Sequence, residues 1–147
     1  MAKVEIYIDG SCSGNPGPGG WAAVCEINGQ TKVRHSYTTD TITNNKAELL
    51  GAIEGLKGVT VKGCEVIIYT DSNYLCTCSE HDKKWLTDKS RPNSELWLQF
   101  IETVEKNRHT YKFVKVAGHS GIRLNEIADK YAKAGCAKAR HERYEIA

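Results

Sequence analysis

The chain has no long apolar run and no N-terminal targeting pattern. No apolar stretch approaches the roughly 20 residues that a membrane-spanning helix needs. Glu5 and Asp9 interrupt the region where a signal peptide requires a continuous apolar segment. We therefore expect a protein without a membrane segment that stays in the cytoplasm. The sequence carries no signature of oligomerisation either, so a monomer is expected.

A strong excess of one charge is also missing. Lys and Arg number 20 against 18 Asp and Glu, so the formal net charge of the 147-residue chain is +2 with neutral histidines. A charge this small argues against bulk electrostatic adhesion to nucleic acid, although it permits a local basic groove.

The six cysteines lack the spacing of a metal site. No Cys-x-x-Cys pair occurs, and Cys76-x-Cys78 has no Cys or His cluster nearby, which disfavours zinc. Several cysteines fall inside apolar strand or helix patterns, so reduced thiols are predicted. A chain of this length buries about 68–70% of its extended-chain surface, so it needs neither disulfides nor a structural metal for stability.

Apolar periodicity predicts three strands in the first third of the chain. Val4 to Asp9 alternate as in a half-buried strand, which the Gly- and Pro-rich stretch 14–20 is expected to end. Residues 21–27 and 31–37 flank Asn28-Gly29, a dipeptide typical of tight hairpin turns. This region is therefore predicted to be a meander.

The rest of the chain alternates helices and strands. Thr43 or Asn44 can cap a helix that ends near Lys57. The pattern then predicts a buried strand at 65–70, a short helix from Ser72, a polar loop at 82–92, a helix at 94–106, a strand at 111–116 and a helix at 124–140. This order predicts one α/β domain, residues 1–147, with a mixed sheet and helices packed on its faces.

Two acids follow apolar strand patterns. Asp9 precedes Gly10 and Asp71 precedes Ser72, each where an apolar strand is expected to give way to a turn or helix. Ligands of open α/β sheets bind beyond the carboxyl ends of strands, where two such acids would converge. Taken alone, each acid is better explained by an ordinary role, Asp9 in a turn and Asp71 as a helix cap.

Glu48 shares one helical face with Gly51, Ala52 and Gly55. Because the rest of that face is small, the helix can lie close to a sheet and hold the acid near the strands. The alternative is an ordinary glutamate near the helix start, favoured by the helix dipole.

Asp129 lies four residues after Asn125 on the last predicted helix, and His119 lies in the preceding loop. The alternatives are a solvated Asp129 paired with Lys133 and a loop histidine without a role. Together, however, four carboxylates without Cys or His ligands favour Mg²⁺ or Mn²⁺. Two such ions about 3.5–4 Å apart promote in-line phosphoryl displacement, so the sequence indicates a phosphodiesterase.

Four motifs carry a family resemblance. They are DGSC with GNPGPGGW from Asp9, TNNKAEL around Glu48, YTDSNY around Asp71, and GHSG followed by NEIAD, which ends at Asp129. With these motifs the chain resembles type I ribonuclease H over nearly its whole length. The resemblance implies a ribonuclease H-like fold with a five-stranded mixed sheet, three strands antiparallel and the others parallel, and helices on both faces.

The resemblance also implies an activity and a site. The activity is endonucleolytic hydrolysis of the RNA strand of RNA/DNA hybrids by water with two Mg²⁺ ions, or Mn²⁺ as a substitute, leaving 5′-phosphate and 3′-hydroxyl ends. Asp9 would bridge both ions, Glu48 and Asp71 would hold the ion on the leaving-group side, and Asp129 would hold the ion beside the water. His119 would assist proton transfer or product release.

Substrate-binding residues follow from the same resemblance. Cys12, Asn15, Asn44, Asn45 and Asn73 match positions that line the minor groove of the hybrid, and Thr43 matches part of a DNA-phosphate pocket. Asn amides can both donate to and accept from the 2′-hydroxyl that distinguishes RNA. Turn and capping chemistry is the alternative role, above all for Asn15 and Asn44.

The sequence departs from the family in two places. Between Tyr74 and Asn93 it is too short for the extra helix and basic protrusion of many members, so a short form is expected. Thr41 stands where several relatives carry a phosphate-contacting Arg. Two other functions compete, a non-catalytic hybrid-binding module and a different nuclease on the same fold. The first should have lost a metal acid, and the second would lack the Asn-rich groove.

Overall fold

The computed structural model describes residues 1–117 and 122–144. Five strands and five helices follow in the order β1 (Lys3–Cys12), β2 (Gly17–Ile27), β3 (Gln30–Ile42), α1 (Asn44–Lys57), β4 (Glu65–Thr70), α2 (Asn73–Cys78), α3 (Lys83–Leu86), α4 (Ser94–Lys106), β5 (Thr110–Lys115) and α5 (Arg123–Tyr144). None of the helices in this described part combines the length and hydropathy needed to cross a bilayer.

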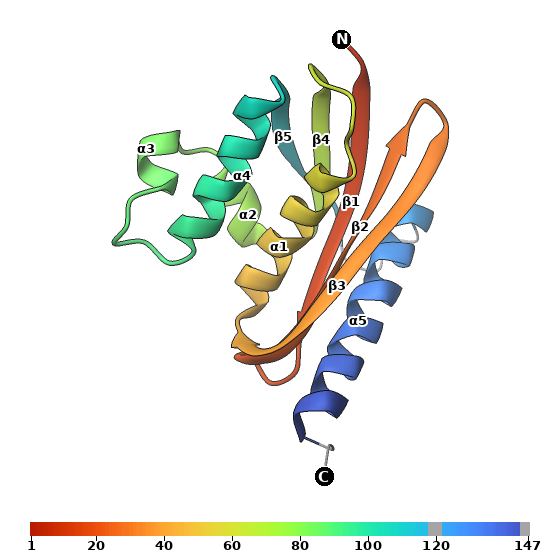
Figure 1. Cartoon of the computed structure of the whole chain (residues 1–147), viewed down its shortest axis with the longest axis vertical. Coiled ribbons are helices and arrows are strands. Elements are labelled where there is room, and N and C mark those ends of the chain that lie inside the picture. The colour runs from red at the N-terminus through yellow and green to blue at the C-terminus, as the bar shows by residue number, and fades with distance from the viewer. Residues whose placement is uncertain (118–121, 145–147) are drawn as a thin grey trace.

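The strands form one mixed sheet in the order β3-β2-β1-β4-β5 (Figure 1). β2 pairs antiparallel with β1 and with β3, whereas β4 pairs parallel with β1 and with β5. The hairpin between β2 and β3 turns at Asn28 and Gly29, whose φ angles of 50° and 78° are those such a tight turn requires. The predicted fold class is confirmed.

Alternation along β1 directs side chains to two different layers. Ile6 and Ile8 are fully buried in the main core with residues of α1, β4 and α4. Tyr7 points to the opposite face, where it packs with Val24 and with Leu124 of α5. The sheet is therefore covered by α1 and α4 on one face and by α5 on the other.

Glycines let α1 lie very close to the sheet, as the small helical face predicted. A Cβ on Gly55 would lie 2.6 Å from Ile6 Cγ2, and one on Gly51 would lie 3.3 Å from the carbonyl oxygens of Asp9 and Ala22. Since real side chains do not fit at the shorter distance, Gly55 fixes the separation of helix and sheet. This separation places the start of α1 beside β1.

The prediction that 14–20 lies between strands was wrong in its second half, because β2 already begins at Gly17. Close packing explains the glycines there: a Cβ on Gly20 would lie 2.5 Å from the backbone nitrogen of Cys136 in α5. β1 likewise continues past Asp9 to Cys12, which pairs with Gly19. Gly20 thus lets α5 approach the sheet, whereas Gly17 lies against the backbone of Ser13.

Other boundaries also differ from the prediction. The segment expected to be a polar loop contains the single-turn helix α3, whose cap Asp82 accepts a hydrogen bond from the Trp85 backbone N–H and whose Leu86 is buried. β3 and α5 are longer than predicted, because each packs along the other. Thr43, and not Asn44, caps α1.

Candidate metal centre and nucleic-acid groove

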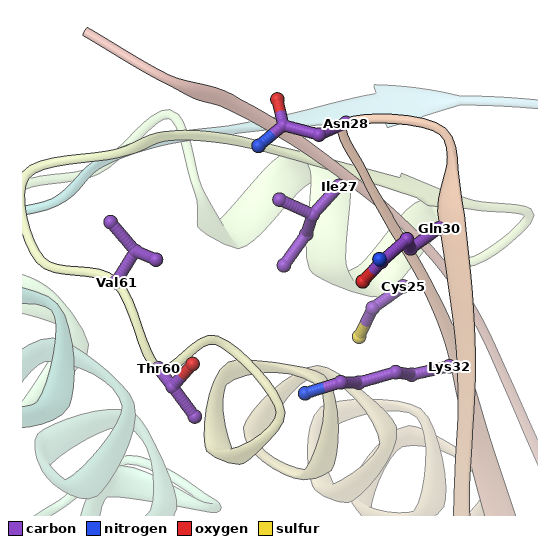
Figure 2. A pocket seen from close by; sticks show the side chains of 7 residues that line it. All are labelled: Cys25, Ile27, Asn28, Gln30, Lys32, Thr60 and Val61. Atoms are coloured by element: carbon purple, nitrogen blue, oxygen red, sulfur yellow. The ribbon is translucent and has the colours of Figure 1, made fainter.

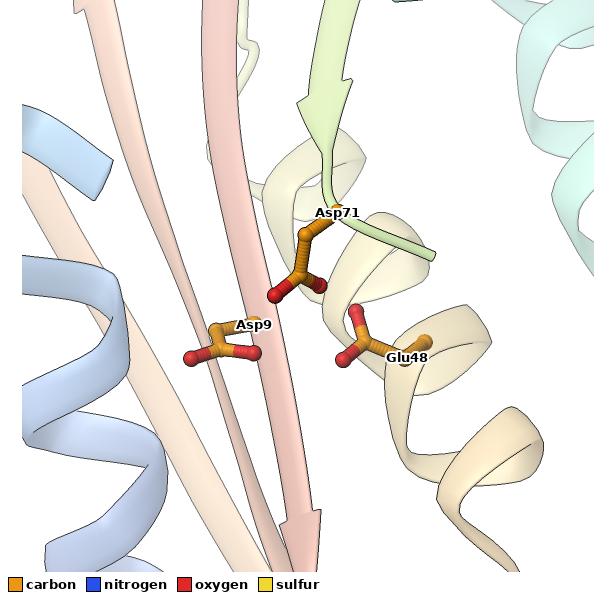
Figure 3. Close-up of side chains that lie close together, drawn as sticks. All are labelled: Asp9, Glu48 and Asp71. Carbon is orange, nitrogen blue, oxygen red and sulfur yellow. The ribbon is translucent and has the colours of Figure 1, made fainter. Parts of the chain in front are cut away.

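Three of the predicted acids lie together at one edge of the sheet. Asp9 comes from β1, Asp71 follows β4, and Glu48 comes from the second turn of α1 (Figure 3). One carboxylate oxygen of each lies within 4.8 Å of the others. The structure thus brings together residues that are far apart in the sequence.

The parallel pairing of β1 and β4 explains the approach of Asp9 and Asp71. The register aligns Tyr7 with Tyr69, which is the last pair before the strands separate. Two residues further along the chain come Asp9, still within β1, and Asp71, directly after β4. Asp9 lies inside β1 and not at its end, so the prediction of a strand terminus there was wrong, although the convergence that it implied is present.

Glu48 is buried, with 7% of its surface exposed. Its Oε1 accepts a hydrogen bond of 3.1 Å from the backbone N–H of Gly10, and Thr70 Oγ1 lies 3.5 Å from Oε2. A Cβ on Gly10 would lie 2.5 Å from the backbone carbon of Ala47, so glycine is required for this approach. Glu48 is therefore held beside β1 and does not extend into solvent, as the small helical face predicted.

Burial, together with neighbouring carboxyl groups, raises the pKa values of Asp9 and Glu48. Burial raises the pKa of Asp9 to about 7, and a hydrogen bond with Asp129 and the charge of Asp71 act in the same direction. Burial, followed by the charges of Asp9 and Asp71, raises the pKa of Glu48 well above its usual value. Such a group is stable as three carboxylates only when positive charge lies between them.

The donor set fits a hard divalent cation. All three side chains offer oxygen, and among residues 1–117 and 122–144 no sulfur or imidazole ligand belongs to the group. Mg²⁺ and Mn²⁺ prefer such ligands, whereas zinc and copper sites use Cys and His. The cluster is the kind of carboxylate site typical of metal-dependent nucleases.

Asp129 lies on α5 and approaches the same edge from the other face of the sheet. Its carboxylate pairs with Lys133 at 3.1 Å, and 25% of its side chain is exposed. It also makes the hydrogen bond that raises the pKa of Asp9. The alternative pairing with Lys133 is thus present together with contact to the cluster. His119 lies outside the described residues.

The predicted substrate residues divide into two groups. Cys12 Sγ and its backbone N–H both donate to Asn44 Oδ1, at 3.0 and 3.3 Å, and the Asn44 N–H donates to Asn15 Oδ1 at 3.0 Å. Thr43 Oγ1 accepts from the Lys46 N–H at 3.1 Å. Cys12 and Asn15 thus connect the end of β1 and the loop after it to the start of α1, whereas Thr43 caps that helix.

The second group faces an open groove of about 390 Å³. The groove is lined by the three acids and by Gly10, Ser11, Asn44, Asn45, Ser72, Asn73 and Tyr74. Side-chain amides thus lie beside the carboxylates in one continuous depression. Sequence reasoning missed two residues that contact the groove lining: Thr70 is hydrogen-bonded to Glu48, and Lys115 is hydrogen-bonded to Asn73. A Thr or Lys at the end of a strand has no distinguishing sequence pattern.

A second hollow of about 220 Å³ lies between the β2–β3 hairpin and the loop after α1 (Figure 2). Cys25, Lys32 and Val61 contribute to its walls, but none of the carboxylates does. Burial raises the pKa of the Cys25 thiol to about 11, so the thiol stays protonated and unreactive at neutral pH. Of these two hollows, the carboxylate groove is the one whose lining contains acidic side chains.

Fold and site together define a nuclease-type α/β domain with an acidic metal centre. The RNase H family model matches residues 1–137, and the chain belongs to the RNase H family. Ribonuclease H from Chelativorans sp. (strain BNC1) is 43% identical over 145 residues, covering 93% of this chain and 87% of the relative. Ribonuclease H from Oleidesulfovibrio alaskensis is 42% identical over 144 residues, 90% of each chain.

Solved structures share the fold. LC11-RNase H1 in complex with an RNA/DNA hybrid has a TM-score of 0.71 at 23% identity, covering 92% of this chain and 98% of the other. RNase H1 from the halophilic archaeon Halobacterium salinarum has a TM-score of 0.67 at 21% identity, with 92% and 98% covered. Family membership makes the protein an endoribonuclease with ribonuclease H activity.

Proposed function

We propose that this protein hydrolyses the RNA strand of RNA/DNA hybrids endonucleolytically, leaving 5′-phosphate and 3′-hydroxyl ends. The convergence of Asp9, Glu48 and Asp71 beside an amide-lined groove is the observation that supports the proposal most directly. Family membership supports the same activity. Hydrolysis forms one P–O bond from water and breaks the P–O3′ bond, and the departing oxygen receives a proton.

Asp9, Glu48 and Asp71, with Asp129 from α5, would hold two Mg²⁺ ions, for which Mn²⁺ can substitute. When bound, the ions supply Lewis-acid stabilisation of the attacking and leaving oxygens. Glu48 is held in place for this role by the Gly10 N–H, and Asp9 is fixed by its position within the paired strand β1. We assign proton transfer or product release to His119.

The groove residues would distinguish RNA from DNA. Asn44, Asn45 and Asn73 line it, and their amides offer both donors and acceptors to 2′-hydroxyls and base edges. Cys12, Asn15 and Thr43 would take part at the rim, Thr43 at a DNA phosphate. The complex of the fold relative LC11-RNase H1 with a hybrid supports this choice of substrate.

We further propose that residues 1–147 form one catalytic domain, which acts as a monomer in the cytoplasm. The short segment between α2 and α4 supports a form without the basic protrusion, because only the single-turn α3 occupies it. Substrate affinity would then depend on few phosphate contacts, so the hybrid should bind more weakly and KM should change less steeply with salt than in a form with the protrusion.

Asp71→Asn tests the proposal. The substitution keeps the size of the side chain but removes a charged ligand, so Mg²⁺-dependent cleavage of labelled RNA/DNA hybrid should be abolished while the circular dichroism spectrum is retained. Asp88→Asn, an exposed Asp in the loop before α4, is the matched control and should cleave normally. Undiminished hydrolysis by Asp71→Asn would contradict the proposal.

Comparing substrates separates the competing functions. The native protein should cleave RNA/DNA hybrid and leave double-stranded RNA and double-stranded DNA intact. Binding of the hybrid without cleavage would indicate a binding module. Cleavage of double-stranded DNA would indicate another nuclease on the same fold.

A further inference from the structure

Lys115, the last residue of β5, spans the turn that carries one of the acids. Its Nζ donates to the backbone oxygen of Asp71 at 2.7 Å and to Oδ1 of Asn73 at 2.6 Å. The ammonium group therefore joins Asp71, the first residue after β4, to Asn73, the first residue of α2. Asp71 bears a carboxylate of the cluster, and Asn73 bears an amide that lines the groove.

The middle of this turn is fixed independently. The Ser72 N–H donates to Thr70 Oγ1 at 3.0 Å, and Ser72 Oγ accepts from the Leu75 N–H at 3.2 Å to cap α2. The Val116 N–H donates to the Thr70 oxygen at 2.8 Å and so continues the pairing of β4 with β5. The turn keeps its path without Lys115, but these bonds leave the rotation of the Asn73 amide free.

The contact with Lys115 fixes the polarity of that amide. An ammonium group has donors and no acceptor, so only the oxygen of the Asn73 carboxamide can face it. The two atoms of the amide are therefore assigned by chemistry, and the NH₂ group is directed away from Lys115. Asn73 then offers its donors, and not its acceptor, to a molecule in the groove.

We propose that Lys115 is a positioning residue for substrate, which holds Asn73 so that the amide presents its NH₂ group to the hybrid. This inference rests on the proposed function. Every base pair displays acceptor atoms in the minor groove, and each ribose oxygen accepts as well. A fixed donor at this position thus binds all sequences alike, whereas a freely rotating amide would spend part of its time with the wrong atom forward.

Lys115→Met tests the assignment, because it removes the ammonium and keeps the length of the stem. Loss of one positioned hydrogen bond should raise KM and the Kd for hybrid by about 3- to 10-fold, with kcat within about twofold of the native value. Lys112→Met is the matched control: it removes the same charge from the same strand at an exposed position on the opposite face, and should leave KM unchanged. Equal effects of the two substitutions would overturn the inference.

A double-mutant cycle separates positioning from direct phosphate contact. In an Asn73→Ala background, Lys115→Met should have less than a twofold further effect on Kd, because its target is gone. Full additivity, together with a salt slope that falls by about one unit, would show that Lys115 contacts a phosphate instead and would refute the proposal.

A third readout does not depend on cleavage. The side-chain NH₂ resonances of Asn73 in the free protein should shift in Lys115→Met and stay in place in Lys112→Met. Unshifted resonances in Lys115→Met would refute the positioning role even if the enzyme is active. Failure of the native protein to cleave hybrid would contradict the proposed function and leave this spectroscopic test intact.

Discussion

Glu48 and Asp129 approach the same edge of the sheet from opposite faces and in very different surroundings. Glu48 is buried on the α1 side, where the backbone N–H of Gly10 holds its carboxylate. Asp129, on the α5 side, keeps a quarter of its side chain in solvent and pairs with Lys133. Glu48 is thus held in place by buried backbone, whereas Asp129 is paired with a cation at the surface.

The difference shows where the electrostatic cost of the site arises. Burial and two neighbouring carboxylates raise the pKa of Glu48, and no Lys or Arg contributes among the causes. On the α5 side, Lys133 already compensates part of the charge of Asp129. The negative charge that a bound cation must compensate therefore lies mainly on the α1 side, and Lys133 reduces the negative charge on the α5 side.

The largest expected contrast is in catalysis. Glu48→Gln should lower kcat/KM by about 10³-fold or more, because a buried ligand has no substitute. Asp129→Asn should cost about tenfold less, since its position is exposed to water that can replace one oxygen ligand. Initial rates on labelled hybrid in Mg²⁺ measure both. Equal losses would show that burial does not distinguish the two acids.

Substitution of one glycine on each face of the sheet compares how much the packing of α1 and of α5 contributes to stability. Gly10→Ala and Gly20→Ala each place a Cβ about 2.5 Å from the backbone of a helix, α1 for Gly10 and α5 for Gly20. Each should lower the free energy of unfolding by about 3 kcal/mol in urea denaturation, because neither backbone can yield cheaply.

Activity should separate the two variants. Gly10 contacts Glu48 directly, so Gly10→Ala should also lose hydrolysis in its folded fraction. Gly20 meets α5 near Cys136, about two turns from Asp129, so folded Gly20→Ala should retain near-native kcat. Loss of kcat in Gly20→Ala would mean that α5 positions the site as strictly as α1.

The smallest expected effect is the dependence of stability on pH without metal. The folded pKa of Asp9 lies near 7, above its ordinary value of 3.8. Between these values the folded carboxyl keeps a proton that the unfolded one releases, so the free energy of unfolding falls as pH rises through this window and levels off above it. With chelator present, Asp9→Asn should be more stable than the native chain at pH 8 by on the order of 1–3 kcal/mol.

The same pair of proteins gives the control. Near pH 4 the native carboxyl is already neutral, so Asp9→Asn and the native chain should unfold at similar urea concentrations. Added Mg²⁺ should stabilise the native chain at pH 8 more than the variant. If the free energy of unfolding of the native chain rises between pH 4 and pH 8, the folded structure does not raise the pKa of Asp9.

Much of this architecture was predictable from local patterns. Local sequence patterns predicted several contacts. Val4, Ile6 and Ile8 alternate with a period of two, the apolar run of β4 is continuous, and the small residues of α1 recur with the helical period. Asn28-Gly29 predicted its turn because few residues adopt positive φ angles. Boundaries were less predictable: Gly17 and Gly20 have turn-type composition, but in β2 Gly17 lies against the backbone of Ser13 and Gly20 lies against α5.

The sequence by itself determined the fold class and the acids, because strand and helix periods and the motifs around Asp9, Glu48 and Asp71 are local properties. Only the tertiary structure decided the register of β1 against β4, the burial of Glu48 against Gly10 and the reach of Lys115 to Asn73. These depend on distances between segments that are 38 and 42 residues apart, which backbone packing sets and no local pattern encodes.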